Sequence, residues 1–276
     1  MLAVPAVAWY AAFFLAPLVF PLYFSFGVSQ GQGGPNIGGF PSLENYQRLG
    51  EQEFLDVFLN TLRMAFLGTV ALLMLAFPMA YFLATRAGRW KFVLLTLFIV
   101  PYWTSFLIRT YSWQILLSSN GPPNAFLEYL GLIDEPLDLL FSPFAVWLGL
   151  VYNYLPLMVI ALFVTLERMD RSLVEAAKDL GAGRVATFRK VTLPLALPGV
   201  LAGAILVFVP LSGEYIVPTL LGGGKSIFIG NVIVQQFGAV RDWAFGATLG
   251  IGMSVVILAV VGCVTLGLRG QLRRVA

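Results

Sequence analysis

The chain has 276 residues, of which 59% are hydrophobic and only 11% are charged. Soluble domains carry about 25% charged residues, and here the charges also avoid long apolar blocks, as in a chain whose solvent is lipid. A single cysteine, Cys263, and the absence of histidine exclude a disulfide framework, a zinc site built on Cys or His, and a catalytic imidazole. We therefore expect no catalytic residue, no metal site and no enzyme activity in this chain.

Six apolar stretches are long enough to cross a bilayer core about 30 Å thick as helices. The N-terminus lacks the basic stretch and the cleavage site of a signal peptide, so we expect the residues from Met1 onward to form a retained first span. Prolines inside most spans predict kinked helices, which suit a moving pathway and an inert bundle alike. The predicted spans are residues 6–28, 57–84, 92–116, 143–166, 195–213 and 243–268.

The distribution of Lys and Arg predicts that both termini are cytoplasmic. Most of these residues lie in the loop 85–91, in the segment 167–194 and in the tail that holds Arg269, Arg273 and Arg274. Six spans place these three regions on one side of the membrane. The segments that then face outward are 29–56, 117–142 and 214–242.

Two of the outward segments have recognisable patterns. Residues 29–56 are rich in Gly and Pro and are expected to form a loop, whereas Ile227 to Phe237 is expected to form a short helix at the outer surface. The run Gly224-Lys225-Ser226 is similar to the end of a phosphate-binding loop, but that motif needs a glycine where Thr219 stands. We expect a tight turn there and no nucleotide site.

The cytoplasmic stretch 171–194 has a pattern unlike the rest of the chain. Ser172 and Glu175 fit an S-x-x-E capping box, which marks the start of a helix, and Gly181 marks its end. A second short amphipathic run follows, and Leu193-Pro194 is expected to turn the chain into the next span. Apolar residues at i, i+3, i+4 and i+7 give the first helix one apolar face, made by Leu173, Ala176, Ala177 and Leu180.

This apolar face needs something to cover it. The membrane interface, the protein's own loops and a partner protein with a matching groove are the three candidates. The residues by themselves do not choose among them.

The run Glu175-Ala176-Ala177, followed by Gly181, Phe188 and Leu193-Pro194, resembles the EAA signature of permease subunits in binding-protein-dependent ABC importers. The resemblance implies a type I ABC importer transmembrane domain over residues 1–276, an all-α membrane protein with about six transmembrane helices. It also implies that the helix of segment 171–194 is a coupling helix, which docks in a cleft of a separate ATPase. The expected coupling residues are Ser172, Glu175, Ala176, Ala177, Asp179, Gly181 and Phe188.

The family also implies partners. They are a second related permease subunit, a dimer of ATP-binding subunits that bind the ATP and Mg, an extracytoplasmic substrate-binding protein, and the lipid bilayer of a bacterial inner membrane. No cofactor is expected in this chain and no nucleic acid among its partners.

A narrower resemblance, to the spermidine/putrescine permeases and especially to the first of their two permease subunits, covers nearly the whole chain. It implies uptake of polyamines, although related permeases handle opines, amino-acid-like solutes and other amines. A secondary transporter and a membrane enzyme are the rival classes, but no internal repeat, strong midplane charge or catalytic constellation supports them. The segments concerned are Pro101-Tyr102-Trp103, Arg109-Thr110-Tyr111, Gly213-Glu214-Tyr215, Pro218 with Leu220-Leu221-Gly222-Gly223, Ile229-Gly230-Asn231, and Arg241 to Gly246.

Several polar and aromatic residues are candidates for a substrate pathway, because charges at membrane depth usually face a cavity or a partner. Glu214, followed by Tyr215, lies near the outer mouth and suits a cationic substrate, but an ion pair between Glu214 and Arg109 is an equal alternative. Asn153, near mid-depth, needs either the substrate or a neighbouring helix as its partner. Trp103 and Tyr152 present rings for cation–π contacts. Three other tryptophans are expected to anchor the chain at the membrane interface: Trp113, Trp147 and Trp243.

Overall fold

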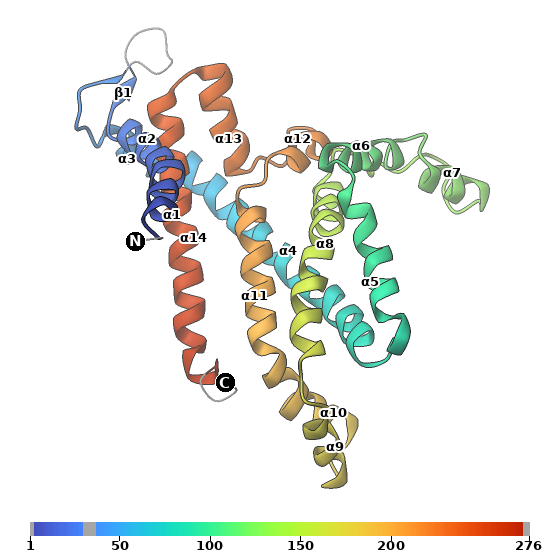
Figure 1. Cartoon of the computed structure of the whole chain (residues 1–276). Helices are drawn as coiled ribbons and strands as arrows, with labels where there is room; N and C mark the ends of the chain where they lie inside the picture. Colours follow the sequence, from blue (N-terminus) through green and yellow to red (C-terminus); the bar gives the residue numbers. More distant parts are fainter. Residues whose placement is uncertain (1–2, 30–36, 273–276) are drawn as a thin grey trace. The chain divides into compact units, whose positions relative to one another are not determined.

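The computed structural model describes residues 3–29 and 37–272, and helices dominate it (Figure 1). Helices α4 (Gln52–Thr85) and α14 (Trp243–Leu272) each begin in one of two compact units and end in the other. The single domain predicted for residues 1–276 stays a prediction. Unit 1 comprises Met1–Leu62, Gly213–Tyr215 and Ile227–Ala259, and unit 2 comprises Arg63–Ser212, Ile216–Ser226 and Val260–Ala276.

Among the described residues, five helices are long and apolar enough to cross a membrane, and a bent pair of helices makes a sixth crossing when it is counted as one span. This agrees with the predicted number of spans. Many large apolar side chains on these helices are exposed, as expected when lipid surrounds them. The five helices are Val7–Ser25, Gln52–Thr85, Pro143–Glu167, Arg184–Ser212 and Trp243–Gly267.

The predicted third span, residues 92–116, is present as the bent pair of helices, and the kink expected from its proline is a sharp break. Helix α5 (Lys91–Ile99) continues into the short 3₁₀ helix η3 (Val100–Trp103), and α6 (Phe106–Leu116) then runs at 87° to them. Proline fixes its own backbone and lacks an N–H, and Thr104, just after η3, is extended. Hydropathy stays high through this break, so an apolar pattern alone does not reveal it.

The outward segment 29–56 is also more regular than the predicted loop. Strand β1 (Val28–Ser29) pairs antiparallel with β2 (Ile37–Gly38), with Val28 opposite Gly38. Helix α3 (Glu44–Leu49) follows, and α4 already begins at Gln52. The predicted helix at 227–237 is confirmed as α13 (Ile229–Gln235), which a π-helix, η5 (Gln236–Val240), extends.

The remaining elements complete the chain order. Helix α1 (Ala3–Tyr10), the π-helix η1 (Ala11–Leu15) and α2 (Ala16–Ser25) form the first crossing. The others are η2 (Gly88–Trp90), α7 (Pro122–Tyr129), α8 (Pro143–Glu167), α9 (Arg171–Asp179), α10 (Arg184–Thr187), the π-helix η4 (Phe188–Thr192), α11 (Leu193–Ser212) and α12 (Ile216–Gly222).

Unit 1 has a small apolar core in which α4, α13 and α14 meet. Its buried members are Phe58, Ile229, Phe245, Leu249 and Met253. The Oγ1 atom of Thr61 accepts a hydrogen bond from the backbone N–H of Ile229 at 2.9 Å, which fixes the start of α13 against α4.

A polar cluster forms around Asp242 in unit 1. Its carboxylate accepts hydrogen bonds from the Ser29 hydroxyl at 2.7 Å and the Phe245 N–H at 3.0 Å, and it forms an ion pair with Arg48 at 3.0 Å. Burial raises the pKa of Asp242, but these bonds together lower the pKa by more than burial raises it, so the net shift is downward. The charged aspartate therefore ties β1, α3 and the start of α14 together.

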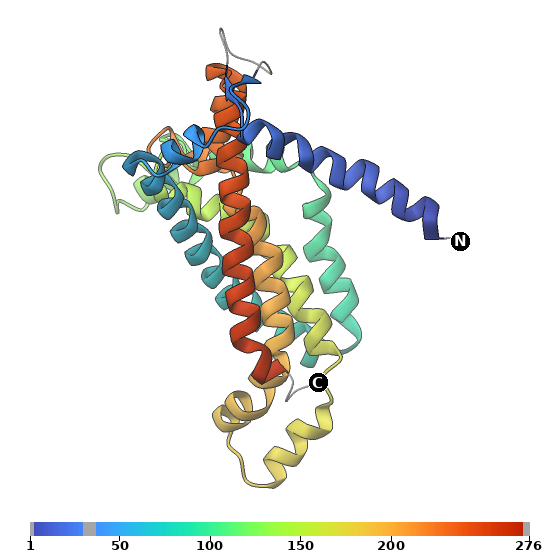
Figure 2. The same cartoon turned by 90° about the vertical axis from the view of Figure 1, so that its left-hand side faces the viewer.

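Unit 2 is built on the pair α8 and α11, which lie side by side (Figures 1 and 2). The backbones approach closely at Gly199, where a Cβ would lie 2.5 Å from the Cβ of Thr165. Helix α12 approaches α8 at Gly149, where a Cβ would lie 2.6 Å from Leu221. Small residues at such crossings are the usual means of packing helices in a membrane.

Candidate coupling segment and pathway residues

Helix α9 lies beyond the ends of α8 and α11, in the segment predicted to couple (Figures 1 and 2). Its N-cap is Asp170, whose carboxylate accepts a hydrogen bond from the Ser172 N–H at 2.9 Å. That bond lowers the pKa of Asp170. The predicted capping box is wrong, because Ser172 is already the second residue of the helix and Asp170 holds the cap position.

The end of α9 follows the prediction. Gly181 has a φ of +82°, the left-handed conformation that glycine adopts readily. The Gly181 N–H donates to the Lys178 carbonyl at 2.8 Å, and the Ala182 N–H donates to the Ala177 carbonyl at 3.0 Å. These bonds close the helix and reverse the chain direction into α10.

The apolar face of α9 is open. None of its residues is fully buried, and Leu180, at its C-cap, is 89% exposed. Leu173 and Val185 are exposed as well. The protein's own described loops therefore do not cover this face, which removes one of the three candidates for its cover.

The predicted coupling residues lie together on this projecting segment. Ser172, Glu175, Ala176, Asp179 and Gly181 are exposed, and Ala177 is half-buried. The structure thus places six of the seven where a partner can reach them. Their docking to an ATPase stays a prediction.

The predicted turn at Leu193-Pro194 is wrong, since the helix runs without interruption from Arg184 to Ser212. A proline inside an α-helix removes a donor and crowds the carbonyl four residues earlier. Here the π-helix η4 precedes Pro194, and the Leu193 N–H donates to the Phe188 carbonyl, five residues back. The wider π turn accommodates the proline without a break.

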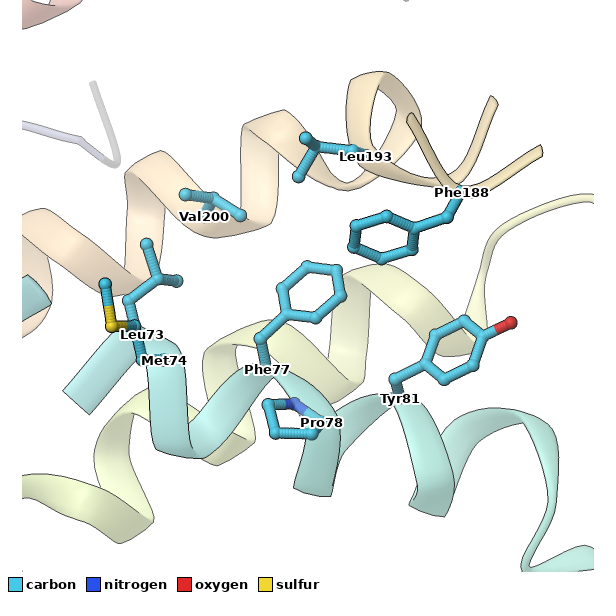
Figure 3. Close-up of a pocket in the computed structure, with 8 residues that line it drawn as sticks. All are labelled: Leu73, Met74, Phe77, Pro78, Tyr81, Phe188, Leu193 and Val200. Atoms are coloured by element: carbon cyan, nitrogen blue, oxygen red, sulfur yellow. The ribbon is translucent and has the colours of Figure 1, made fainter. Parts of the chain in front are cut away.

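Phe188, the seventh coupling candidate, turns toward its own chain. Its ring meets the ring of Phe77 on α4 edge-on, with centroids 5.6 Å apart and planes at 88° (Figure 3). Beside this contact lies an apolar cavity of about 460 Å³ between α4 and the η4–α11 region. The residues that line it are Leu73, Met74, Phe77, Pro78, Tyr81, Phe188, Leu193 and Val200.

Charged contacts attach the same end of unit 2 to neighbouring helices. The Nη2 atom of Arg171, the first residue of α9, donates to the Ala84 carbonyl of α4 at 2.6 Å. Lys91, at the start of α5, forms an ion pair with Glu167, at the end of α8. The sequence does not reveal Arg171 and Phe77, because their contacts join residues that are far apart in the chain. It does not single out Asp170, because Ser172 competes with it for the cap position.

A second cavity, of about 430 Å³, lies between α6 and α8 and brings together two pathway candidates, Arg109 and Tyr152. Arg109 is only 8% exposed, and its guanidinium lies over the Tyr102 ring at 4.7 Å. Trp113 also lines this cavity and meets Tyr152 edge-on at 5.3 Å. Trp113 is predicted to be an anchor at the membrane interface, and its spacing of four residues from Arg109 places both residues on one helix face.

Asn153, the neighbour of Tyr152, is 1% exposed. Its Nδ2 atom donates to the Gly149 carbonyl at 2.9 Å and to the Thr110 hydroxyl on α6 at 3.4 Å. The neighbouring helix α6 therefore supplies one partner of Asn153, and this was one of the two predicted alternatives, the other being the substrate. Its Oδ1 atom has no hydrogen-bond partner among the described residues, and contact with substrate stays a prediction.

The other three pathway candidates lie elsewhere. Trp103 is on η3, 79% exposed, and does not line the Arg109 cavity. Glu214 and Tyr215 follow α11 in the sequence and belong to unit 1. Glu214 is 6% exposed, and its Oε1 atom accepts a hydrogen bond from the Tyr215 N–H at 3.0 Å. Since Arg109 belongs to unit 2, its pairing with Glu214 stays a prediction.

The glycine run at 222–224 forms a tight turn, as predicted. Gly223 and Gly224 both have positive φ values, +54° and +77°, and the Lys225 N–H donates to the Gly222 carbonyl at 3.0 Å. Phe141 packs directly against Gly223, where a Cβ would lie 2.7 Å from its ring.

Comparison with known proteins places this arrangement in a family. Residues 1–271 match the family described as "Binding-protein-dependent transport system inner membrane component". The chain is 45% identical, over 216 residues and 78% of each chain, to the spermidine/putrescine transport system permease protein PotB of Escherichia coli K12. It is 36% identical to the protein of the same name from Haemophilus influenzae, over 92% of this chain and 88% of that relative.

A solved structure supports the fold. The chain superposes with a TM-score of 0.75 on a chain of a bacterial ABC transporter involved in the import of the acidic polysaccharide alginate, at 18% identity, covering 100% of this chain and 94% of that one. The chain therefore belongs to the inner membrane components of binding-protein-dependent transport systems and is a multi-pass protein of the inner membrane. The predicted resemblance and the predicted fold class are confirmed.

Proposed function

We propose that this chain is a permease subunit of an ATP-binding-cassette importer and forms part of a translocation pathway for polyamines such as spermidine and putrescine. The identity of 45% to PotB over 78% of each chain supports the substrate class. The open apolar face of α9, with Leu180 89% exposed, supports docking to a separate ATPase. A short amphipathic helix of this kind fits a groove in a partner protein.

The assembly follows from the number of docking sites. One chain offers one coupling helix, whereas a dimer of ATP-binding subunits offers two clefts, so a second related permease completes the complex. An extracytoplasmic binding protein delivers the substrate to the outer face. ATP and Mg are held by the ATPase subunits, and this chain contributes no catalytic residue, no cofactor and no contact with nucleic acid.

The mechanism is alternating access. Closure of the ATPase dimer on ATP pulls the two coupling helices together and opens the pathway outward, and hydrolysis reverses the movement. Ser172, Glu175, Ala176, Ala177 and Asp179 supply the docking surface. In the pathway, Glu214, Tyr215, Trp103, Tyr152 and Asn153 are the proposed contacts for a cationic substrate.

One observation favours a second substrate class. The Arg109 guanidinium is nearly buried beside the α6–α8 cavity, and a fixed positive charge there attracts a carboxylate and repels a polycation. An amino-acid-like solute or an opine, which carries both charges, is therefore the alternative substrate. A secondary transporter has no such supporting observation.

A reconstituted complex tests the proposal. The chain, its second permease, the ATPase and the binding protein are placed in proteoliposomes, and uptake of labelled spermidine, putrescine, an opine and an amino acid is measured with and without ATP. We expect ATP-dependent uptake of the polyamines alone. Uptake of only the opine or the amino acid assigns the alternative substrate, and uptake by the chain alone without ATPase overturns the importer.

A pair of glycine variants tests the coupling helix in the same assay. Gly181→Val forces a β-branched residue into the φ of +82° and is expected to reduce uptake about tenfold through loss of the docking geometry. Gly183→Ser, in the same loop, keeps a φ of −65° at a helix N-cap and is expected to leave uptake unchanged. Equal uptake by both variants contradicts the coupling role.

A further inference from the structure

Helix α4 is far from the coupling segment in sequence but is held by it at two points. Arg171 donates from Nη2 to the Ala84 carbonyl at 2.6 Å, across 87 residues of chain. Ala84 is buried in the last turn of α4, where carbonyls lack helical partners and the helix dipole is negative. A guanidinium bond to such a carbonyl is charge-assisted and stronger than a neutral one.

The second point of contact lies seven residues earlier on α4. There Phe77 meets Phe188 edge-on, beside the apolar cavity of about 460 Å³ that α4 and the η4–α11 region share (Figure 3). Both halves of the coupling segment therefore touch α4, the first through Arg171 and the second through Phe188. Cavity space beside an aromatic contact leaves these side chains room to shift.

Pro78 lies between the two points and lines the same cavity. It has no N–H to donate to the Met74 carbonyl, so α4 lacks one helical hydrogen bond there and bends more easily. The part of α4 beyond Pro78 is the part whose last turn Arg171 holds. A movement of α9 that is transmitted to Ala84 therefore acts on the part of α4 after Pro78, which can bend relative to the part before it.

We propose that Arg171 is a positioning residue that makes the Ala84 end of α4 move with the coupling helix, so that ATP-driven movement of α9 reaches α4 as well as α8 and α11. Along the chain, α9 follows α8 and leads through α10 and η4 to α11, whereas its link to α4 depends on non-covalent contacts. The inference rests on the proposed importer function.

The test measures coupling, not activity alone. In the reconstituted complex, the number of ATP molecules hydrolysed per substrate imported is compared for wild type, Arg171→Ala, Arg171→Lys and Arg168→Ala. Arg168 is exposed at the end of α8 and forms no side-chain hydrogen bond or ion pair with the described residues. We expect the ratio to rise about fivefold in Arg171→Ala, to be largely restored in Arg171→Lys, and to stay at the wild-type value in Arg168→Ala.

The outcomes separate the two proposals. A wild-type complex whose ATP hydrolysis does not drive uptake contradicts the proposed function. A coupled wild-type complex with an unchanged ratio in Arg171→Ala, or with the same rise in Arg168→Ala, overturns the role of Arg171.

A distance measurement covers the case in which Arg171→Ala assembles poorly and uptake is too low to measure. Spin labels at Arg86→Cys and Lys178→Cys, two exposed positions at the end of α4 and on α9, are placed in a Cys263→Ala background. We expect a narrow distance distribution that keeps its mean when ATP binds, and a broadened one in detergent-solubilised Arg171→Ala. A narrow distribution in both proteins overturns the inference.

Discussion

Asp170 and Arg171 are adjacent residues that fix α9, the proposed coupling helix, at its start and against α4. Asp170 satisfies a backbone N–H at the start of α9, and Arg171 satisfies a carbonyl at the end of α4. One bond therefore determines where the helix begins, and the other determines which neighbour it stays beside. Both contacts are polar, whereas no residue of α9 is buried.

A pair of alanine variants tests the helix cap. Asp170→Ala removes the acceptor for the Ser172 N–H and is expected to speed amide exchange in the first turn of α9 about fivefold. Ser172→Ala, the change that the sequence pattern singles out, keeps that N–H and loses only the bond from the Ser172 hydroxyl to Asp170, so we expect a smaller increase in exchange there. Hydrogen exchange of the purified protein checks this, and the reverse order of effects contradicts the cap assignment.

The same cap predicts a pH dependence. The hydrogen bond from Ser172 lowers the pKa of Asp170 in the folded helix. The cap's contribution is therefore fully present above the ordinary pKa of an aspartate, and it is lost as the pH falls through the lowered value. In Asp170→Ala, exchange in this turn, corrected for its intrinsic rate, does not acquire this acidic dependence.

At the scale of single residues, sequence patterns predicted those features that depend only on neighbouring residues in the chain. Gly181 ends α9 because a left-handed residue is needed there, and glycine between two amphipathic runs signals it. Asp170 was missed because aspartate and serine both cap well, so a pattern with the two at neighbouring positions does not choose between them. The contact of Phe188 with Phe77 depends on how α4 lies beside α11, which no local pattern contains.

At the scale of elements, the close packing of α8 against α11 depends on Gly199, which has no side chain. At Gly199 a Cβ would lie 2.3 Å from the Oγ1 atom and 2.5 Å from the Cβ of Thr165. Real Cβ atoms do not approach neighbours so closely, so any larger residue must push the helices apart. The helix that leads into the coupling segment and the helix that leaves it are thereby held together.

We expect Gly199→Ala to destabilise the protein by about 2 kcal/mol through overpacking. Gly262→Ala is the matched control, because Gly262 also lies in a helix and its Cβ would meet nothing within 4 Å; it is expected to leave the melting temperature unchanged or slightly raised. Melting in detergent measures both. Thr165→Ala in the Gly199→Ala background is expected to restore stability, and failure to do so excludes the Thr165 clash as the cause.

The long spans were predictable because apolar stretches of sufficient length have few alternatives in a bilayer. Breaks and continuities inside them were harder to predict. The helix is broken near Pro101, where the backbone after η3 is extended. It is not broken at Pro194, where a preceding π turn accommodates the proline. The same residue type thus has opposite effects, and the backbone around it decides which one occurs.

For the whole molecule, the orientation in the membrane rests on the distribution of Lys and Arg. Arg273 and Arg274 lie outside the described residues, so the tail's share of this charge pattern stays a prediction. The segment 171–194 and the segment 117–142 are predicted to lie on opposite sides. Each contains an exposed position suited to labelling, Lys178 and Glu135.

Cysteine labelling of intact cells tests this orientation. In a Cys263→Ala background, a membrane-impermeant maleimide is expected to label Glu135→Cys in intact cells and Lys178→Cys only after permeabilisation. The uptake assay confirms that both variants are assembled. Labelling of Lys178→Cys from outside contradicts the cytoplasmic position of the coupling segment.

The open apolar face of α9 has a consequence for the lifetime of the chain in the cell. A leucine as exposed as Leu180 is the kind of surface that chaperones and proteases recognise in incompletely assembled proteins. We expect copies that find no partner to be removed faster than copies that do. The surface proposed to dock to a partner would then also match the amount of this subunit to the supply of its partners.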